Sequence, residues 1–332
     1  MRLRELSLFA GIGGGLLGLR DFARPVVAVE LSPFCRAVLK RQQHKKRLDA
    51  FPIWDDITTF NSNRWKNRVE IITGGFPCQA FSTATHGVSV AKDLWPEMLR
   101  LIDEIRPQMV FAENVAETAL VRAARDCSRL GYYSSIMGMR ASDVGAPHIR
   151  RRYWLLAYTS PEAVPSVNGG VEKSDFWQTP PAGYVDGDPK IKNRGENYLQ
   201  RVFGRNFRVH TPTGAANFTA PCMQRHLGCS NFIKAFGADR PTPEVLEWLM
   251  GLPTGWTDLG SSGDWEERYT AIGNAQVPHV AKAAFQFLCH RVKADSVNSL
   301  AERAANEMGR SAAAAIGAPR LSARIARASP AR

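Results

Sequence analysis

The stretch "GGFPCQAFS", residues 74–82, contains a cysteine in an unusual setting. Cysteine is most often buried and inert. Cys78, however, follows two glycines and a proline and precedes a Ser- and Thr-rich segment, which indicates an exposed position at the end of a strand. A thiolate held there would be a strong carbon nucleophile. From these residues alone, a structural cysteine and a nucleophile are equally good interpretations.

Two further groups could do acid–base or electrostatic work. Glu113 ends the apolar stretch 107–115, where burial would raise the pKa of its carboxyl and keep it protonated for acid catalysis. Arg150 and Arg152 alternate in "HIRRR", so in a strand their side chains point the same way. Taken singly, each of these residues is more often an ordinary surface carboxylate or arginine.

The stretch "FAGIGGGLLG", residues 9–18, could bind a cofactor. Gly13, Gly15 and Gly18 match the GxGxxG spacing, which lets backbone N–H groups approach a ligand. Glu30 ends the second apolar stretch, where a carboxylate can bind ribose hydroxyls. Nicotinamide, flavin and S-adenosylmethionine cofactors all fit this pattern, and so does a glycine turn without a ligand. Asp56 in "WDDIT" is a weak candidate for an adenine contact.

The elements that would position these residues alternate along the first half of the chain. Helical stretches separate short apolar strands, which are predicted at residues 3–11, 25–31, 69–75, 107–115 and 152–158. Such alternation predicts an α/β fold with a doubly wound sheet, whose ligands lie beyond the carboxyl ends of the strands. Residues 159–239 lack periodicity and are rich in Pro, Gly and Asn, which indicates a loop-rich second unit. Helical patterns resume at residues 242–253 and 277–292.

Composition indicates a nucleic-acid partner and a reducing compartment. The net charge is +12, and nearly all of the excess lies in residues 150–240 and 291–332, which favours a polyanion. Six cysteines without a CxxC pair favour reduced thiols. With no signal peptide and no apolar run long enough to span a bilayer, we expect a cytoplasmic protein. We assign no metal, because Cys222, His226 and Cys229 lack an evident fourth ligand.

Seven short motifs occur in an order that resembles the DNA cytosine-5 methyltransferase family. In chain order they are "FAGIGG", "VELSPF", "DDI", "GGFPCQAFS", "ENV", "HIRRR" and "AIGNAQVP". The resemblance covers roughly residues 4–158 and 240–290, and "TPEVLEWLMGLPTGWTD" is most similar to phage and prophage members. The chain departs from the family pattern at Glu70, where Asp is usual, and at His148, where Gln is usual.

The resemblance implies a mechanism and a set of site residues. Cys78 would attack C6 of a flipped-out cytosine, and C5 would then take the methyl group of S-adenosylmethionine. Glu113 would hold the N3 edge of the base and supply a proton, and Arg152, with Arg150 beside it, would contact O2. The expected DNA contacts are Gln79, Ser82 and Asn114. The expected cofactor contacts are Phe9, Ala10, Gly11, Ile12, Gly13, Gly14, Glu30, Asp56, Ile57, Pro77, Leu94 and Asn274.

The resemblance also implies the domain organisation. A catalytic domain with a doubly wound mixed sheet, Rossmann-like and dependent on S-adenosylmethionine, is expected over residues 1–158 and 264–292. A smaller target recognition domain, together with its boundary motif, would occupy 159–263, and a flexible basic tail 293–332. We expect a monomer acting on duplex DNA, with a cognate restriction endonuclease as a candidate partner. The alternatives are a dehydrogenase, an RNA cytosine-5 methyltransferase and a catalytically silent DNA-binding relative.

Overall fold

The computed structural model describes residues 2–77, 93–168, 170, 173–177, 210–211, 214–215, 242–260 and 265–316, of which 210–211, 214–215 and 299–316 are described by their backbone alone. Cys78, Gln79 and Ser82 therefore lie outside the described residues, as do Cys222, His226 and Cys229.

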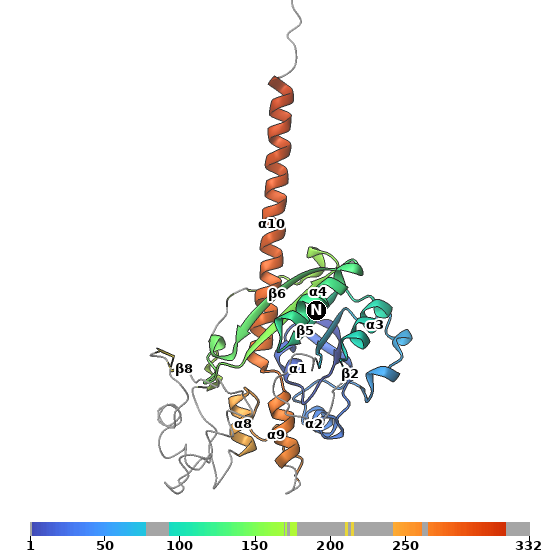
Figure 1. The fold of residues 1–332 in the computed structure, drawn as a ribbon, viewed down its shortest axis with the longest axis vertical. Helices are drawn as coiled ribbons and strands as arrows, with labels where there is room; N and C mark the ends of the chain where they lie inside the picture. Colours follow the sequence, from blue (N-terminus) through green and yellow to red (C-terminus); the bar gives the residue numbers. More distant parts are fainter. Residues whose placement is uncertain are drawn as a thin grey trace, which may run out of the picture.

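A seven-stranded sheet forms the centre of the molecule (Figure 1), in the order β3-β2-β1-β4-β5-β7-β6. Its strands are β1 (Leu3–Leu8), β2 (Ala23–Val29), β3 (Ile53–Trp54), β4 (Ile71–Gly75), β5 (Met109–Asn114), β6 (Tyr133–Arg140) and β7 (Arg151–Tyr158). The first five strands pair in parallel, whereas β7 pairs antiparallel with β5 and with β6. The predicted mixed α/β sheet is thus confirmed. Strand β6 was not predicted, because it lies at the sheet edge and its sequence is too polar to resemble an apolar strand.

Helices cover both faces of the sheet. They are α1 (Gly14–Leu19), α2 (Pro33–His44), α3 (Trp95–Ile105), α4 (Glu117–Arg129), α8 (Pro243–Leu249), α9 (Trp265–Asn274) and α10 (Pro278–Ile316). One core cluster packs α1, α2, α8 and α10 against one face, and a second packs α3 and α4 against the other. Because side chains alternate along a strand, the first face also carries the polar residues Glu5, Ser7, Thr73 and Glu113. The site is therefore built on the face that α1 and α10 cover.

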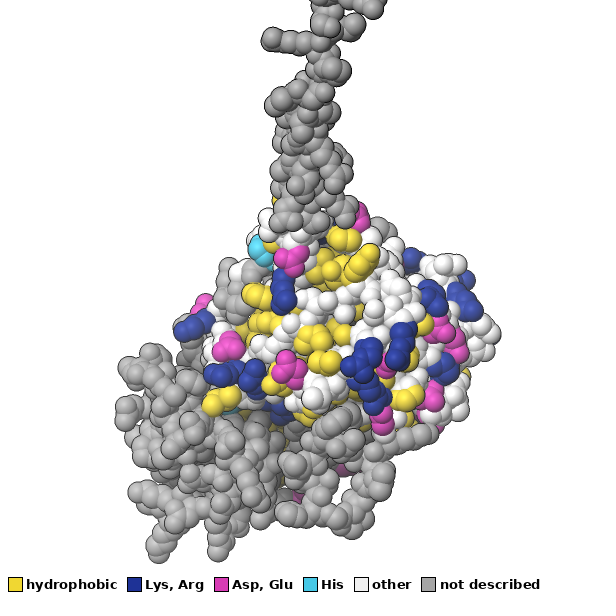
Figure 2. Space-filling view, turned by 45° about the horizontal axis from the view of Figure 1, so that its top comes forward, with side chains coloured by type: hydrophobic (Ala, Val, Ile, Leu, Met, Phe, Trp, Pro, Cys, Tyr) yellow, Lys and Arg dark blue, Asp and Glu magenta, His cyan; other side chains and the backbone are white. Residues whose placement is uncertain are grey.

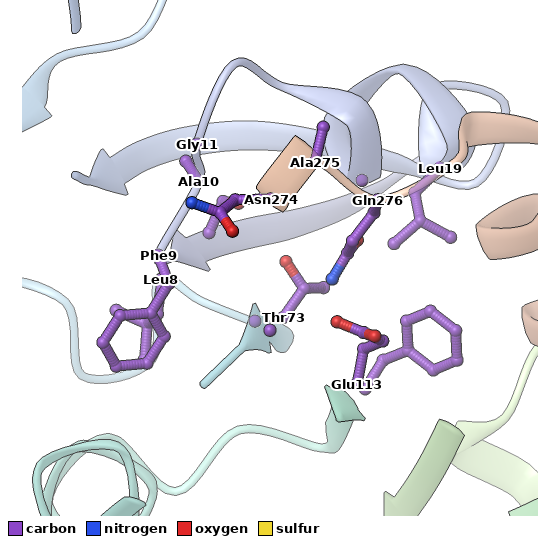
Figure 3. Close-up of a pocket in the computed structure, with 15 residues that line it drawn as sticks. Leu8, Phe9, Ala10, Gly11, Leu19, Thr73, Glu113, Asn274, Ala275 and Gln276 are labelled. Carbon is purple, nitrogen blue, oxygen red and sulfur yellow. The ribbon is translucent and has the colours of Figure 1, made fainter. Parts of the chain in front are cut away.

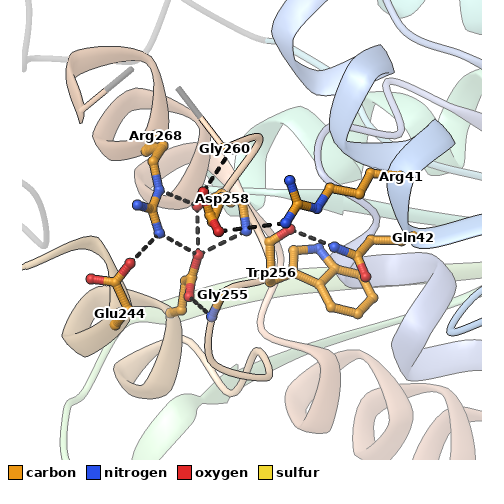
Figure 4. A network of polar contacts seen from close by, with 10 residues as sticks. Arg41, Gln42, Glu244, Gly255, Trp256, Asp258, Gly260 and Arg268 are labelled. Carbon is orange, nitrogen blue, oxygen red and sulfur yellow. Dashed lines mark hydrogen bonds and ion pairs between the residues drawn. The ribbon is translucent and has the colours of Figure 1, made fainter. Parts of the chain in front are cut away.

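The segment 242–260 belongs to this body rather than to a separate recognition unit (Figure 4). The Trp256 indole donates to the Ile12 carbonyl at 2.7 Å, and the Gln42 amide donates to the Trp256 carbonyl at 2.5 Å. Glu247 is fully buried and accepts hydrogen bonds from Gly255 N and Thr257 N. The apolar face of α8 packs into the main core, so this boundary segment lies against the sheet-containing body, and the extent of the recognition domain stays a prediction.

Helix α10 extends well beyond residue 293, where we expected the tail to begin (Figure 1). Between Pro278 and Pro319 the sequence has no proline and is rich in alanine, so nothing in its composition stops the helix before Gly317. The first turns of α10 pack on α1, whereas the later turns project from the body. Among the described residues, no helix combines the length and the apolar composition needed to cross a membrane.

Candidate active site

A pocket opens where the carboxyl ends of β1, β4 and β5 meet the turn between α9 and α10 (Figure 3). The three strands bring together segments that are far apart in sequence, as expected for the strand ends of an α/β sheet. The lining residues are Ser7, Leu8, Phe9, Ala10, Gly11, Gly15, Leu19, Thr73, Gly74, Gly75, Phe111, Glu113, Asn274, Ala275 and Gln276.

The loop after β1 forms the rim of this pocket. Phe9, Gly11 and Gly13 all have positive φ angles (52°, 54° and 89°), so the chain turns sharply there. Glu30, at the end of β2, shapes the loop: its carboxylate accepts from Gly11 N at 2.6 Å and from Ser32 N at 2.8 Å. Glu30 therefore joins the ends of β1 and β2 at the place where the sequence predicted a cofactor.

Two glycines of α1 pack closely against backbone. A Cβ on Gly14 would lie 2.1 Å from the Gln276 carbonyl oxygen, and one on Gly18 would lie 2.4 Å from the Pro278 carbonyl oxygen. These glycines let α1 approach the turn before α10 closely enough to close the back of the pocket. Of the three glycines with the GxGxxG spacing, Gly18 thus makes a helix–backbone contact, whereas Gly15 lines the pocket.

Asp56 and Ile57 lie beyond β3, on the β2 side of the loop. Asp56 caps the short helix η1 (Ile57–Thr59), since its carboxylate accepts from Thr58 N at 2.9 Å and from the Thr58 hydroxyl at 2.8 Å. Ile57 is buried, with 5% of its surface exposed. Neither lines the pocket, so an adenine contact for them stays a prediction.

Glu113 is the acidic group of the pocket. It is largely buried, with 12% of its side chain exposed, and its Oε1 lies 3.2 Å from Arg152 Nε. Burial raises the pKa of the Glu113 carboxyl, while Arg152, Arg150 and a hydrogen bond from the Gln276 side chain act in the opposite direction. Burial outweighs these opposing effects, so the Glu113 carboxyl binds its proton more tightly than an exposed glutamate does.

Arg150 ties β7 to the turn between α9 and α10. Its guanidinium donates to the carbonyls of Gly273 at 2.8 Å and Ala275 at 3.1 Å. Only 8% of Arg150 is exposed, and its pKa is lowered mainly by burial and next by Arg152. The two alternating arginines thus have different partners. Arg152 pairs with Glu113, and Arg150 binds the backbone of the turn between α9 and α10.

Asn114 anchors the chain that leads to Cys78. Its amide nitrogen donates to the Phe76 carbonyl at 3.0 Å, its amide oxygen accepts from Ala116 N at 3.0 Å, and only 3% of the residue is exposed. These contacts favour a positioning role over the DNA contact that we expected. In addition, Leu94 N donates to the Pro77 carbonyl at 3.4 Å, so both ends of the segment 78–92 are held together.

A second buried carboxyl, Glu5, lies beneath the pocket floor. It is 1% exposed, and its Oε1 accepts from the Thr73 hydroxyl at 2.5 Å. Burial raises the pKa of Glu5 to about 7, and the Thr73 hydrogen bond opposes this only in part. Sequence reasoning missed Glu5, although an acidic residue inside the alternating stretch "LRELSL" is the available signal.

His148, which stands where the family usually has Gln, does not point into the pocket. It is fully buried, and its Nε2 lies 2.7 Å from the Leu249 carbonyl at the end of α8. Burial lowers the pKa of the imidazole to about 3, so the ring is neutral and serves as packing between β7 and α8.

The predicted site residues therefore fall into distinct groups. The pocket brings together Phe9, Ala10, Gly11, Glu113 and Asn274, with Arg150 and Arg152 behind Glu113. Ile12, Gly13 and Gly14 support the loop from within the core, and Pro77 and Leu94 mark the two ends of the segment that carries Cys78. Sequence reasoning missed Ser7, Thr73 and Phe111, which stand in no motif, and Gln276, which stands in the last motif beside Asn274 but was not singled out.

Comparisons with known proteins agree with this geometry. A family model for C-5 cytosine-specific DNA methylases matches residues 3–182. Type II methyltransferase M.CviJI of Paramecium bursaria Chlorella virus IL3A is 34% identical over 197 residues, which are 56% of this chain and 52% of that enzyme, so the chain spans about half of that relative. Type II methyltransferase M.NgoMIV of Neisseria gonorrhoeae is 25% identical over 325 residues, covering 89% of this chain and 100% of that enzyme.

A solved structure shows the same fold. The Entamoeba histolytica methyltransferase EhMeth superposes with a TM-score of 0.58 at 13% identity, covering 87% of this chain and 98% of that one. The family model covers more than half of the chain and includes the β1 loop, Glu113 and the paired arginines. The chain therefore belongs to the family of C-5 cytosine-specific DNA methylases.

Proposed function

We propose that this chain transfers a methyl group from S-adenosylmethionine to C5 of a cytosine flipped out of duplex DNA, through a covalent bond between Cys78 and C6. The observation that carries the proposal is the group formed by Glu113, Arg152 and Arg150, which borders the pocket behind the β1 loop. In the sequence Cys78 directly follows Pro77, which lies two residues beyond the end of β4.

The residues around the β1 loop fit S-adenosylmethionine. Each Glu30 oxygen accepts one loop N–H and retains a further lone pair for a ribose hydroxyl. Leu31 beside it is 66% exposed and offers an apolar surface to a purine ring. A Cβ on Gly11 would meet no atom within 4 Å, so space remains in front of the loop backbone. When bound, S-adenosylmethionine supplies an electrophilic methyl group.

The chemistry of cytosine explains the residue types. C5 is a weak nucleophile until a thiolate adds to C6, which moves the C5–C6 electron pair onto C5. Protonation of N3 by Glu113 neutralises the ring at the same time, and Arg152 keeps the carboxyl oriented. After C5 has taken the methyl group, solvent removes the C5 proton, and the returning electron pair expels the Cys78 thiolate. The N3 proton returns to Glu113.

Duplex DNA is the proposed partner because neither face of a stacked cytosine is accessible to a thiolate. The excess of Lys and Arg in residues 150–240 and 291–332 supports phosphate contacts there. Both relatives are named Type II methyltransferases, which supports a place beside a restriction endonuclease. We further propose that the protein acts as a monomer in the cytoplasm.

The experiment uses the full chain, methyl-tritiated S-adenosylmethionine and duplex DNA, followed by bisulfite sequencing. We expect label at cytosine C5 within one short sequence. Duplex DNA made with 5-fluorocytosine should trap a denaturation-resistant protein–DNA complex, because fluorine cannot leave C5 as a cation. Cys78→Ser should abolish both turnover and trapping.

Cys35→Ser is the matched control. Cys35 is 7% exposed, and burial raises the pKa of its thiol to about 11, so this variant should retain turnover and trapping. Label on the exocyclic amine, or in RNA but not in duplex DNA, would refute the proposed reaction.

A further inference from the structure

Gln276 occupies a space that two glycines leave open. A Cβ on Gly15 of α1 would lie 2.4 Å from the Gln276 Oε1, and a Cβ on Gly75 at the end of β4 would lie 3.0 Å from its Nε2. A side chain at Gly15 would force the Gln276 amide to shift, and one at Gly75 would press tightly against it. The side chain is therefore confined between α1 and the sheet.

The confined amide reaches Glu113. The Gln276 side chain hydrogen-bonds to the Glu113 carboxyl, and Figure 3 shows its nitrogen directed toward that group. A Cβ on Gly75 would lie 2.8 Å from Glu113 Oε2, so this oxygen is on the Gln276 side, whereas Oε1 faces Arg152. The two carboxyl oxygens thus have different partners.

The backbone of Gln276 is fixed from both sides. Arg150 holds the carbonyls of Gly273 and Ala275 just before it, and Gly14 packs against its own carbonyl. The same turn carries Asn274, which lines the pocket. A displacement of this turn would consequently move the Gln276 amide relative to Glu113.

We propose that Gln276 is a positioning residue that fixes the Glu113 carboxyl from the side opposite Arg152 and connects it to the turn that carries Asn274. This inference rests on the proposed function, in which Glu113 protonates the cytosine N3. In this proposal the motif "AIGNAQVP" has two tasks: Gln276 positions the Glu113 carboxyl, and Asn274 contacts the cofactor.

The hydrogen bond also affects proton affinity. An N–H donor favours the ionised carboxyl, so the contact works with Arg152 and Arg150 against the effect of burial. Among the described residues, these two arginines are the charged groups that act on Glu113. Loss of the amide should therefore raise the pKa of Glu113 and move the alkaline limb of the kcat/KM profile to higher pH.

The test compares Gln276→Met, which retains the length but not the hydrogen bond, with Gln276→Glu, which replaces the donor by a like charge. For both variants we expect kcat to fall about tenfold or more, and the alkaline limb to shift upward, further for the Glu variant. The Kd for S-adenosylmethionine, measured by calorimetry, should change less than about twofold. Gln286→Met on α10 is the matched control, and its pH profile should equal that of the wild type.

Infrared spectroscopy of isotope-labelled Glu113 reports its pKa without turnover. A raised pKa in the Met variant, relative to the wild type, supports the contact even if the wild type shows no methylation, an outcome that would overturn only the proposed function. If the Met variant does not fold, the Glu variant provides the same measurement. An unchanged Glu113 pKa and an unchanged pH profile in a folded variant would overturn the inference.

Discussion

At the scale of single residues, partners decide what a buried carboxyl does. Glu113 and Glu5 lie on the same face of the sheet, and burial raises the pKa of both. Glu113 has two arginines and an amide beside it, whereas the Thr73 hydroxyl is the partner that opposes burial at Glu5. In the proposed function, Glu113 would pass a proton to the cytosine, whereas ionisation of Glu5 beneath the pocket destabilises the fold.

Glu5→Gln should make the protein less sensitive to alkaline pH. Glu5 ionises near pH 4.5 when unfolded and near pH 7 when folded, so the wild type loses free energy of unfolding as pH rises through this window. Relative to the wild type, the variant should gain up to about 3 kcal/mol between pH 4.5 and pH 8. Urea denaturation at several pH values measures this gain.

Other buried titrating groups, such as His148, act alike in the wild type and the variant. His148, with its pKa lowered to about 3, destabilises the fold as pH falls below 6.5, and it does so equally in both proteins. If the free energy of unfolding changed with pH in the same way for the wild type and Glu5→Gln, the pKa of Glu5 would be equal in the folded and unfolded states. That result would contradict the prediction.

The residue types that perform chemistry were predictable, but their neighbours were not. Glu113 and Arg152 stand in short motifs whose order is informative in the sequence itself. Thr73 and Gln276 gain meaning only from the distances to Glu5 and Glu113, which arise when separate strands and turns come together. A one-dimensional pattern does not contain those distances.

At the scale of elements, the pocket depends on how closely α1 approaches the start of α10. Gly18 permits this approach, since a Cβ there would lie 2.4 Å from the Pro278 carbonyl oxygen and 3.0 Å from the Ala281 Cβ. Backbone atoms cannot rotate away, so relief would require a shift of the whole helix. The glycine therefore sets the spacing between two helices.

Gly18→Ala should lower the free energy of unfolding by about 1–3 kcal/mol, even though alanine favours helix formation. It should also weaken S-adenosylmethionine binding, because the shift of α1 carries the β1 loop with it. Gly170→Ala is the control: a Cβ there would meet nothing within 4 Å, so we expect a change below about 0.5 kcal/mol. Equal urea midpoints for the two variants would contradict this account of α1.

The limits of elements were harder to predict than their existence. The apolar strands 25–31 and 107–115 were predicted from composition, and they coincide with most of β2 and with the whole of β5. The end of α10 was not predicted, because an Ala-rich sequence is compatible with either a helix or a flexible tail. The assignment of 242–260 to the body depended on buried partners such as Glu247 with Thr257, which no local pattern predicts.

At the scale of the molecule, most of the excess positive charge lies in other parts of the chain than the pocket. On the face in Figure 2, Lys and Arg are interspersed with Asp and Glu over the described body, so this face presents no single-sign surface. The excess positive charge lies instead in residues 150–240 and 291–332, where Arg150 and Arg152 belong to the Glu113 group and the other Lys and Arg residues do not. We therefore expect non-specific DNA affinity to depend on these stretches, and catalysis to depend on the pocket.

Truncation after Asn298 tests this separation for the C-terminal stretch. It removes six arginines and two glutamates but retains Val292, which is buried, and Lys293, whose Nζ donates to the Pro161 carbonyl at 2.8 Å. The free energy of unfolding and the turnover at saturating DNA should thus be unchanged. Affinity for non-specific duplex DNA at low salt should fall, and the slope of log K against log salt should become shallower by about 0.9 for each DNA phosphate that the shortened protein no longer neutralises.

A full-length variant with those six arginines changed to glutamine separates charge from helix length. If it reproduces the truncation, the effect is electrostatic, because the chain that continues α10 is retained while its positive charge is removed. Titrations of both proteins against random duplex DNA between about 50 and 200 mM salt would decide the matter. Identical affinities and slopes for the wild type and both variants would mean that residues 299–332 do not bind DNA, and the phosphate contacts would then have to come from residues 150–240.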